Sequence, residues 1–189
     1  MRTTILLTAV LGMGVVQPVR AAAHTVVYNA TGTFATLPLS GADQFKLAGE
    51  PFNLSLTVSE ATKPVKQSMY AAQYANIPLS GTVHSGNFPE MPIPIPPNQF
   101  ATFSLEVGAP GQPDLGTVQA TVLVLGTPIA FSAKFVLPPG TLTGKAIRPF
   151  TAPVTLTPSD AALKYDLTQF EGGTTTLVTA SGSLTTTVQ

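Results

Sequence analysis

The sequence predicts an all-β fold: a single antiparallel β-sandwich, immunoglobulin-like or Greek-key with a jelly roll as the alternative, behind an N-terminal signal peptide. Three observations support it. The 189 residues include 18 Pro and 16 Gly, which break helices and mark turns. Several segments alternate apolar and polar residues, the pattern of half-buried strands. Only residues 158–164 carry a helix start signal, where Ser159 or Asp160 would cap a single turn.

The first 23 residues have the organisation of a secretory leader. Arg2 precedes an uncharged, largely apolar run of twelve residues, 5–16, and Ala21 and Ala23 supply the small residues of a cleavage site. The apolar run is shorter than the roughly 20 residues that a membrane span requires. We therefore expect cleavage after Ala23, with Ala21 as an alternative site, and a mature domain of residues 24–189. A membrane anchor or an apolar first strand would be the other interpretations of this segment.

The clearest predicted strand covers residues 52–59, where Phe52, Leu54, Leu56 and Val58 alternate with polar side chains. Residues 128–137 repeat that pattern, and residues 117–125 end in a continuous apolar stretch that suits a covered strand. Gly126 and Thr127 lie between these two segments, so they predict a hairpin. Weaker alternation predicts further strands at residues 25–36, 68–74, 79–84, 100–107, 152–157, 174–180 and 183–188.

The edge strands of the predicted sheets are the places where a partner could bind. Ser181 and Gly182 predict a second hairpin, and this C-terminal segment, residues 174–188, is rich in Thr and free of Pro and charge. We expect it at a sheet edge, where unpaired backbone groups can recruit a protein partner or a second copy. Residues 88–98 contain five Pro and predict an extended loop or edge segment.

Composition excludes several classes of function. The chain has no Cys, so it holds no disulfide and no Cys-ligated metal. Nine basic residues balance nine acidic ones, which argues against a nucleic-acid partner. Thr and Ser together number 38, and no second apolar run is long enough to span a membrane. Together with the predicted signal peptide, these features indicate a protein that is secreted or periplasmic, and its low charge without Cys favours a bacterial source.

The residues that catalysis needs are sparse. Only His24 and His84 could act as an imidazole base, no Ser lies in a nucleophile-elbow motif, and the nine acids are dispersed along the chain. Calcium-loop and phosphate-loop motifs do not occur. The sequence therefore favours a non-catalytic module of the envelope or extracellular space, with its ligand or partner left open.

One alternative is a copper site. Cleavage after Ala23 would make His24 the N-terminal residue, whose amine and imidazole could chelate a metal, and His84 could add a third nitrogen. This set resembles the histidine brace of lytic polysaccharide monooxygenases and of some periplasmic copper-binding proteins. The resemblance rests on His24 and His84 alone and implies copper as cofactor, with an oxidative enzyme or a copper-binding protein as the function.

A second alternative is a weak carbohydrate-binding module. Such modules lay an aromatic ring against a sugar, and Tyr70 and Tyr74 are four residues apart. On one strand they would share a face and form a small platform. The chain has no Trp that could serve the same purpose.

Overall fold

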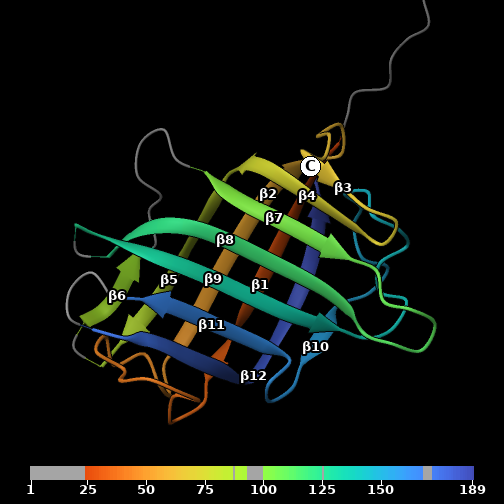
Figure 1. The fold of residues 1–189 in the computed structure, drawn as a ribbon. Coiled ribbons are helices and arrows are strands. Elements are labelled where there is room, and N and C mark those ends of the chain that lie inside the picture. Colours follow the sequence, from red (N-terminus) through yellow and green to blue (C-terminus); the bar gives the residue numbers. More distant parts are fainter. Residues whose placement is uncertain (1–23, 87, 93–99, 125, 168–171) are drawn as a thin grey trace, which may run out of the picture.

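The structure, a computed structural model, describes residues 24–86, 88–92, 100–124, 126–167 and 172–189. These residues form strands and irregular segments without any helix, so the all-β prediction is confirmed. The predicted signal peptide, residues 1–23, lies outside the described residues. The strands, shown in Figure 1, are β1 (Thr25–Phe34), β2 (Pro51–Ser59), β3 (Lys66–Gln67), β4 (Ala71–Ile77), β5 (Leu79–Ser85), β6 (Phe88–Pro92), β7 (Ala101–Glu106), β8 (Asp114–Val124), β9 (Thr127–Leu137), β10 (Val154–Leu156), β11 (Ala161–Asp166) and β12 (Thr174–Val188).

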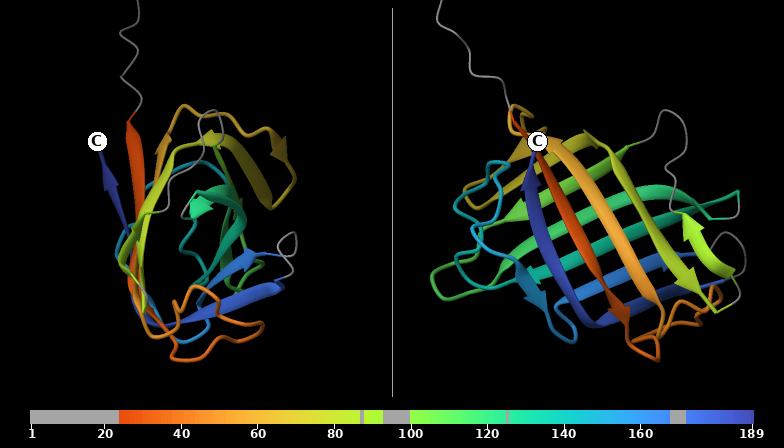
Figure 2. Two further views of the ribbon diagram at one scale, coloured as in Figure 1. Left: turned by 90° about the vertical axis from the view of Figure 1, so that its left-hand side faces the viewer. Right: turned by 180° about the vertical axis from the view of Figure 1, so that it is seen from behind.

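The strands form one continuous antiparallel sheet that folds over on itself. Its order is β3-β4-β7-β8-β9-β11-β12-β1-β2-β5-β6, and β10 pairs with β12 beside this path. The β1 half contains β6, β5, β2, β1, β10 and the C-terminal part of β12. The β8 half contains β3, β4, β7, β8, β9, β11 and the N-terminal part of β12. Strands of the two halves cross in Figure 1 and form two facing layers in Figure 2, whereas the sequence predicted two separate sheets.

β12 joins the halves and corrects the predicted C-terminal hairpin. Residues Thr174–Val178 pair with β11, and residues from Thr179 onward pair with β1. Gly182 does not make a turn, because it lies directly opposite Gly32 of β1. A Cβ at Gly182 would lie 2.5 Å from the carbonyl oxygen of Thr31. The small residue therefore permits a close backbone approach shortly after the strand changes partners. The segment is a connection between the two halves of the sheet, and residues 182–184 pair with both β1 and β10, whereas residues 185–188 pair with β1 alone and keep the predicted edge position.

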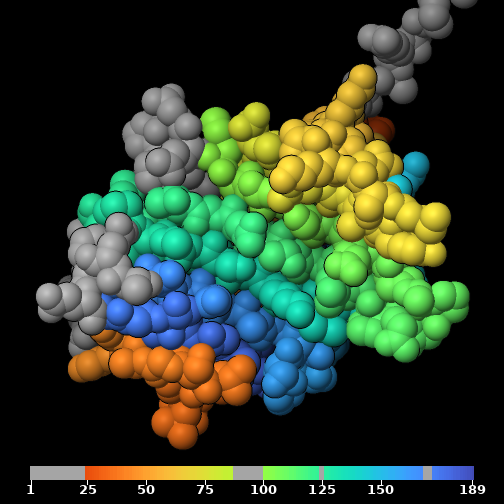
Figure 3. Space-filling view, in the orientation of Figure 1, coloured from red at the N-terminus to blue at the C-terminus, as the bar shows by residue number. Residues whose placement is uncertain are grey.

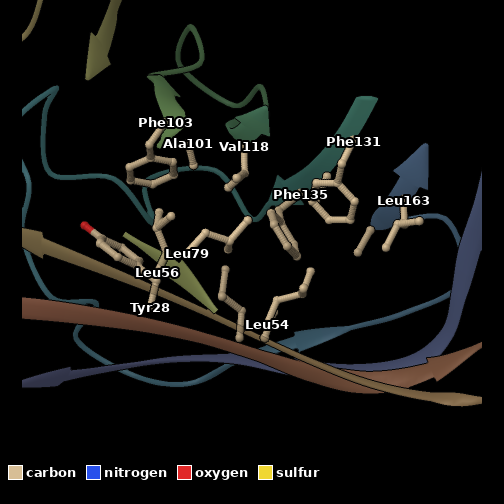
Figure 4. Packing of buried hydrophobic residues seen from close by; sticks show 14 of the residues in the cluster. Tyr28, Leu54, Leu56, Leu79, Ala101, Phe103, Val118, Phe131, Phe135 and Leu163 are labelled. Atoms are coloured by element: carbon tan, nitrogen blue, oxygen red, sulfur yellow. The ribbon is translucent and has the colours of Figure 1, made fainter. Parts of the chain in front are cut away.

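The predicted strand at residues 52–59 is confirmed as β2, and its alternation builds the core. Leu54 and Leu56 of β2 project with Tyr28 of β1 toward Phe103 and Phe135 of the β8 half (Figure 4). The rings of Tyr28 and Phe103 lie 5.2 Å apart between centroids, so aromatic contacts join the two layers. The predicted hairpin at Gly126 is also confirmed, because β8 and β9 pair from Val124↔Thr127 to Asp114↔Leu137.

The predicted helical turn at residues 158–164 is wrong. Asp160 accepts a hydrogen bond at 2.8 Å from the amide of Thr157, three residues before it, whereas a helix cap accepts from an amide two or three residues after it, and the chain then enters β11. Ala161, Leu163 and Tyr165 of β11 are buried and alternate with outward-facing residues. The period of two therefore decides the structure here, and the capping signal belongs to the turn before the strand.

The two edge strands of the sheet, β3 and β6, are short or rich in proline. β3 has two residues, both exposed. β6 contains Pro89 and Pro92, which have no amide hydrogen to donate. This arrangement confirms the predicted edge position for residues 88–92, while residues 93–98 of that prediction lie outside the described residues. Short edges and proline both hinder the addition of a strand from another chain.

Candidate functional site

The two histidines lie at opposite ends of β2. His24 precedes Thr25, which pairs with Ser59, whereas His84 follows Val83, which pairs with Phe52. The seven residue steps from Phe52 to Ser59 span roughly 23 Å at about 3.3 Å per residue. The structure therefore does not bring the two imidazoles within reach of one metal ion. Among the described residues there is also no group of three or more His, Cys, Asp or Glu side chains that could hold one.

The two tyrosines of the predicted sugar platform are in different environments. Tyr70 is 59% exposed and lies in the turn before β4, whereas Tyr74 is 2% exposed within β4. The Tyr74 hydroxyl donates a hydrogen bond to the backbone carbonyl of Lys145. Because one ring faces solvent and the other faces the core, this pair does not form the predicted platform.

Tyr74 belongs to a set of contacts that fasten residues 138–153 over one end of the folded sheet. The Tyr28 hydroxyl donates to the Arg148 carbonyl at 2.9 Å, and the Phe150 amide donates to Thr186 Oγ1 at 2.7 Å. Asp114 adds the most buried contact, because its carboxylate is 1% exposed and accepts the amides of Gly108 and Leu142 at 2.7 and 2.8 Å. These polar groups therefore serve to hold a long connection in place.

A second set of contacts fastens residues 35–50. Asp43 accepts a hydrogen bond from the Tyr165 hydroxyl at 3.0 Å and another from the Ala48 amide at 2.7 Å. Thr175 of β12 donates to the Ala42 carbonyl at 2.6 Å, and Ser85 donates to the Phe45 carbonyl at 2.7 Å. Both long connections are thus held by side chains of the sheet, and these side chains have partners within the fold.

Burial keeps the tyrosine phenols in the protonated form that these contacts need. It raises the pKa of Tyr28 above its usual value near 10, and the hydrogen bond to Arg148 offsets only part of this rise. Burial likewise raises the pKa of Tyr165 to about 12, and the nearby Asp43 charge adds to the effect. The pKa of Tyr74 is raised by burial as well. An ordinary phenol is already protonated at neutral pH, so the raised pKa values extend these contacts into alkaline solution.

The space between the two layers is apolar and nearly filled. A cavity of about 30 Å³ lies among Tyr28, Leu56, Phe103 and Phe135, together with neighbouring core residues. An engineered apolar cavity of roughly 150 Å³ is large enough for benzene, so this one is much too small for an organic ligand. The interior is therefore a packed core.

An open hollow lies on the outer face of the β8 half, the face turned to the viewer in Figure 3. We call this hollow, of about 550 Å³, the outer groove. Its lining residues come from β7, β8, β9 and β11 and from the residue before β7: Phe100, Thr102, Gln119, Ala120, Thr121, Ala130, Phe131, Ser132, Lys164 and Asp166.

Strand register explains how the outer groove is assembled. Thr102 pairs with Gln119, Gln119 pairs with Ser132, and Ser132 pairs with Lys164, so one row of side chains crosses four strands. Ala130 lies one position along the same face of β9, between Thr121 and Asp166. The short side chains of Ser132 and Ala130 leave space between longer neighbours, and this difference in length hollows the face.

Only weak signals in the sequence point to the outer groove. Gln119 and Lys164 occupy ordinary outward positions of alternating strands, where polar residues are common. Their proximity depends on the pairing of β8 with β9 and of β9 with β11, and the second pairing joins strands that are not consecutive. The alternation of apolar and polar residues in 161–166 predicts a strand at β11, and this alternation is the sequence signal that could have suggested the row.

The chain shows no match to any protein-family model, curated protein or solved structure. No helix within the described residues is long and apolar enough to cross a membrane. Any functional conclusion therefore depends on the chemistry of the surface and of the polar groups described above.

Proposed function

We propose that this chain is an exported, non-catalytic binding module of the envelope or extracellular space, which uses the outer groove of a sandwich-like domain. The observation that carries the proposal is the contrast in how polar side chains are used. Asp114, Asp43 and the buried tyrosines hold the long connections in place, whereas Gln119 and Lys164 are exposed beside a hollow. An open hollow lined by a few polar groups is a common form of binding site.

The non-catalytic part of the proposal is supported by the positions of the acids. Asp114 is enclosed by two backbone amides, and Asp43 is bound by an amide and a phenol. General acid and base chemistry requires a titratable group within reach of a substrate. The buried Asp114 carboxylate therefore lacks the access to substrate that catalysis demands, and both oxygens of the half-buried Asp43 carboxylate already accept hydrogen bonds.

The exported part of the proposal is supported by the sequence of residues 1–23, and cleavage there is compatible with the fold. Thr25 starts β1 and exchanges backbone hydrogen bonds of 3.0 and 2.8 Å with Gln189. His24 is exposed just before this pair. A signal peptidase that cuts after Ala23 would therefore leave the whole folded sheet intact.

The first experiment follows the full chain during expression in bacteria. N-terminal sequencing of the exported protein should find His24 as the first residue, and intact Met1 in cytoplasmic protein would contradict export. The exported protein is then sedimented with insoluble envelope and extracellular material of the source organism. We expect cosedimentation that is lost in the double variant Gln119→Ala/Lys164→Ala.

A matched control is available at the sheet edge. Lys66→Ala/Gln67→Ala removes the same two side-chain types from exposed positions of β3. This control should cosediment as well as the unchanged protein. Equal loss in both double variants, or no cosedimentation of the unchanged protein, would refute a binding function of the outer groove.

A further inference from the structure

We infer that the ligand of the outer groove is a neutral, polyhydroxylated chain, that is, an uncharged oligosaccharide. The inference rests on the proposed function and specifies its ligand class. It is carried by three features of the groove: side chains that both donate and accept hydrogen bonds, one exposed aromatic ring at the margin, and a local balance of charge.

The hydrogen-bonding groups suit hydroxyls. Thr102, Thr121 and Ser132 carry hydroxyls that donate and accept, and the Gln119 amide does both through two different atoms. A sugar hydroxyl also donates and accepts, so each of these side chains can bind it in either direction. A ligand with only acceptors, such as a phosphate chain, would leave half of this capacity unused.

Phe100 supplies an apolar surface beside these polar groups. Its ring is 52% exposed, although the other phenylalanines with described burial are buried or half-buried. The carbon-bound hydrogens on one face of a pyranose ring form an apolar patch that packs on an aromatic ring. Burying such exposed apolar area is favourable at about 25 cal/mol per Å², so a sugar would gain from contact with Phe100.

Charge argues for an uncharged ligand. Lys164 and Asp166 lie two residues apart on one face of β11, so the groove carries one positive and one negative side chain. The whole chain has nine basic and nine acidic residues. Polyanions are attracted by clusters of Lys and Arg, and this groove has a single Lys beside an Asp.

The size and openness of the groove suit a chain rather than a single small molecule. Its volume of about 550 Å³ falls within the roughly 300–1,000 Å³ of small-ligand sites, and it is an open hollow on the surface of the sheet. A ligand in an open hollow of this kind keeps one side exposed to solvent, so a bound segment can belong to a longer polymer. This shape favours recognition of a few consecutive sugar units within a longer glycan.

The test uses three uncharged hexasaccharides, cellohexaose, maltohexaose and chitohexaose, titrated into the mature protein by isothermal calorimetry. We expect at least one to bind with a millimolar or lower dissociation constant. Phe100→Ala should weaken that binding at least tenfold, and Gln119→Ala should weaken it severalfold. Tyr70→Ala, which removes an exposed ring outside the groove, should leave the affinity unchanged.

Two results would overturn the inference: no binding of any of the three hexasaccharides at millimolar concentration, or binding that Phe100→Ala and Gln119→Ala leave unchanged. Circular dichroism of each variant confirms that it is folded. If envelope cosedimentation still depends on Gln119 and Lys164 while no hexasaccharide binds, the ligand class is wrong and the binding module stands. Failure of both assays refutes the proposed function itself.

Discussion

Polar side chains have different roles in two regions of this molecule, the long connections and the outer groove. At the ends of the folded sheet, the buried Asp114 and Tyr28 and the half-buried Asp43 form hydrogen bonds with the backbone of the two long connections. In the outer groove, Gln119 and Lys164 are exposed on a continuous strand surface that needs neither of them for pairing. Residue type alone thus does not identify a site, because Asp114, Asp43 and Tyr28 carry titratable groups but stabilise the fold.

The largest expected effect concerns Asp114. Asp114→Ala leaves the amides of Gly108 and Leu142 without their acceptor in a buried place. Hydrogen bonds to charged groups contribute about 1.5–3 kcal/mol each, so we expect the free energy of unfolding to fall by roughly 3–5 kcal/mol. Urea unfolding measures this change. Asp114→Asn, which keeps one acceptor oxygen, should lose less, and a loss below about 1 kcal/mol for Asp114→Ala would contradict a structural role.

A smaller effect is expected from the tyrosines. Tyr28→Phe keeps the ring contacts with Phe103 and Phe150 but removes the hydroxyl that donates to the Arg148 carbonyl. The loss of one hydrogen bond should lower the free energy of unfolding by about 1 kcal/mol. Tyr70→Phe, at an exposed position, is the control and should change it by a few tenths. Equal effects in the two variants would show that the Tyr28 hydroxyl does not hold the 138–153 connection.

The same phenols predict a loss of stability in alkali. The pKa of Tyr165 is raised to about 12 in the folded protein, while an unfolded phenol titrates near 10. Above pH 10 the unfolded state therefore releases a proton that the folded state keeps, so the free energy of unfolding falls as pH rises from 10 to 12. It should be constant with respect to these phenols below pH 9. Urea unfolding at pH 8, 10 and 11.5 measures the decline, and Tyr165→Phe should make it shallower; an identical slope in both proteins would contradict the prediction.

The sequence predicted most of the strands because a period of two is a local signal. The alternation in β2 and the glycine between β8 and β9 required no knowledge of the rest of the fold. The hairpin predicted at Gly182 was wrong because glycine is suited both to a tight turn and to a place where two backbones lie close together. Only its position opposite Gly32, 150 residues earlier, distinguishes the two cases.

The site was harder to predict because it depends on contacts between segments that are distant in the sequence. Tyr70 and Tyr74 were paired by their spacing, but the structure places one at a turn and the other in the core. Conversely, Gln119 and Lys164 have no notable spacing, and each pairs directly with Ser132 across neighbouring strands. Contacts that depend on register and on the order of strands are not encoded in any local pattern, so a surface site of this kind becomes visible only once the fold is known.

The smallest effect on stability is expected in the outer groove, and it separates the two regions most sharply. Gln119→Ala and Lys164→Ala remove exposed side chains, so each should change the free energy of unfolding by less than about 0.5 kcal/mol. Cosedimentation with envelope material should nevertheless decline, whereas an Asp114→Asn protein that remains folded should bind normally. Urea unfolding and the binding assay on the same samples measure both properties. If the groove variants lost stability in proportion to binding, the polar groups of the outer face would serve the fold as those at its ends do, and the distinction between the regions would disappear.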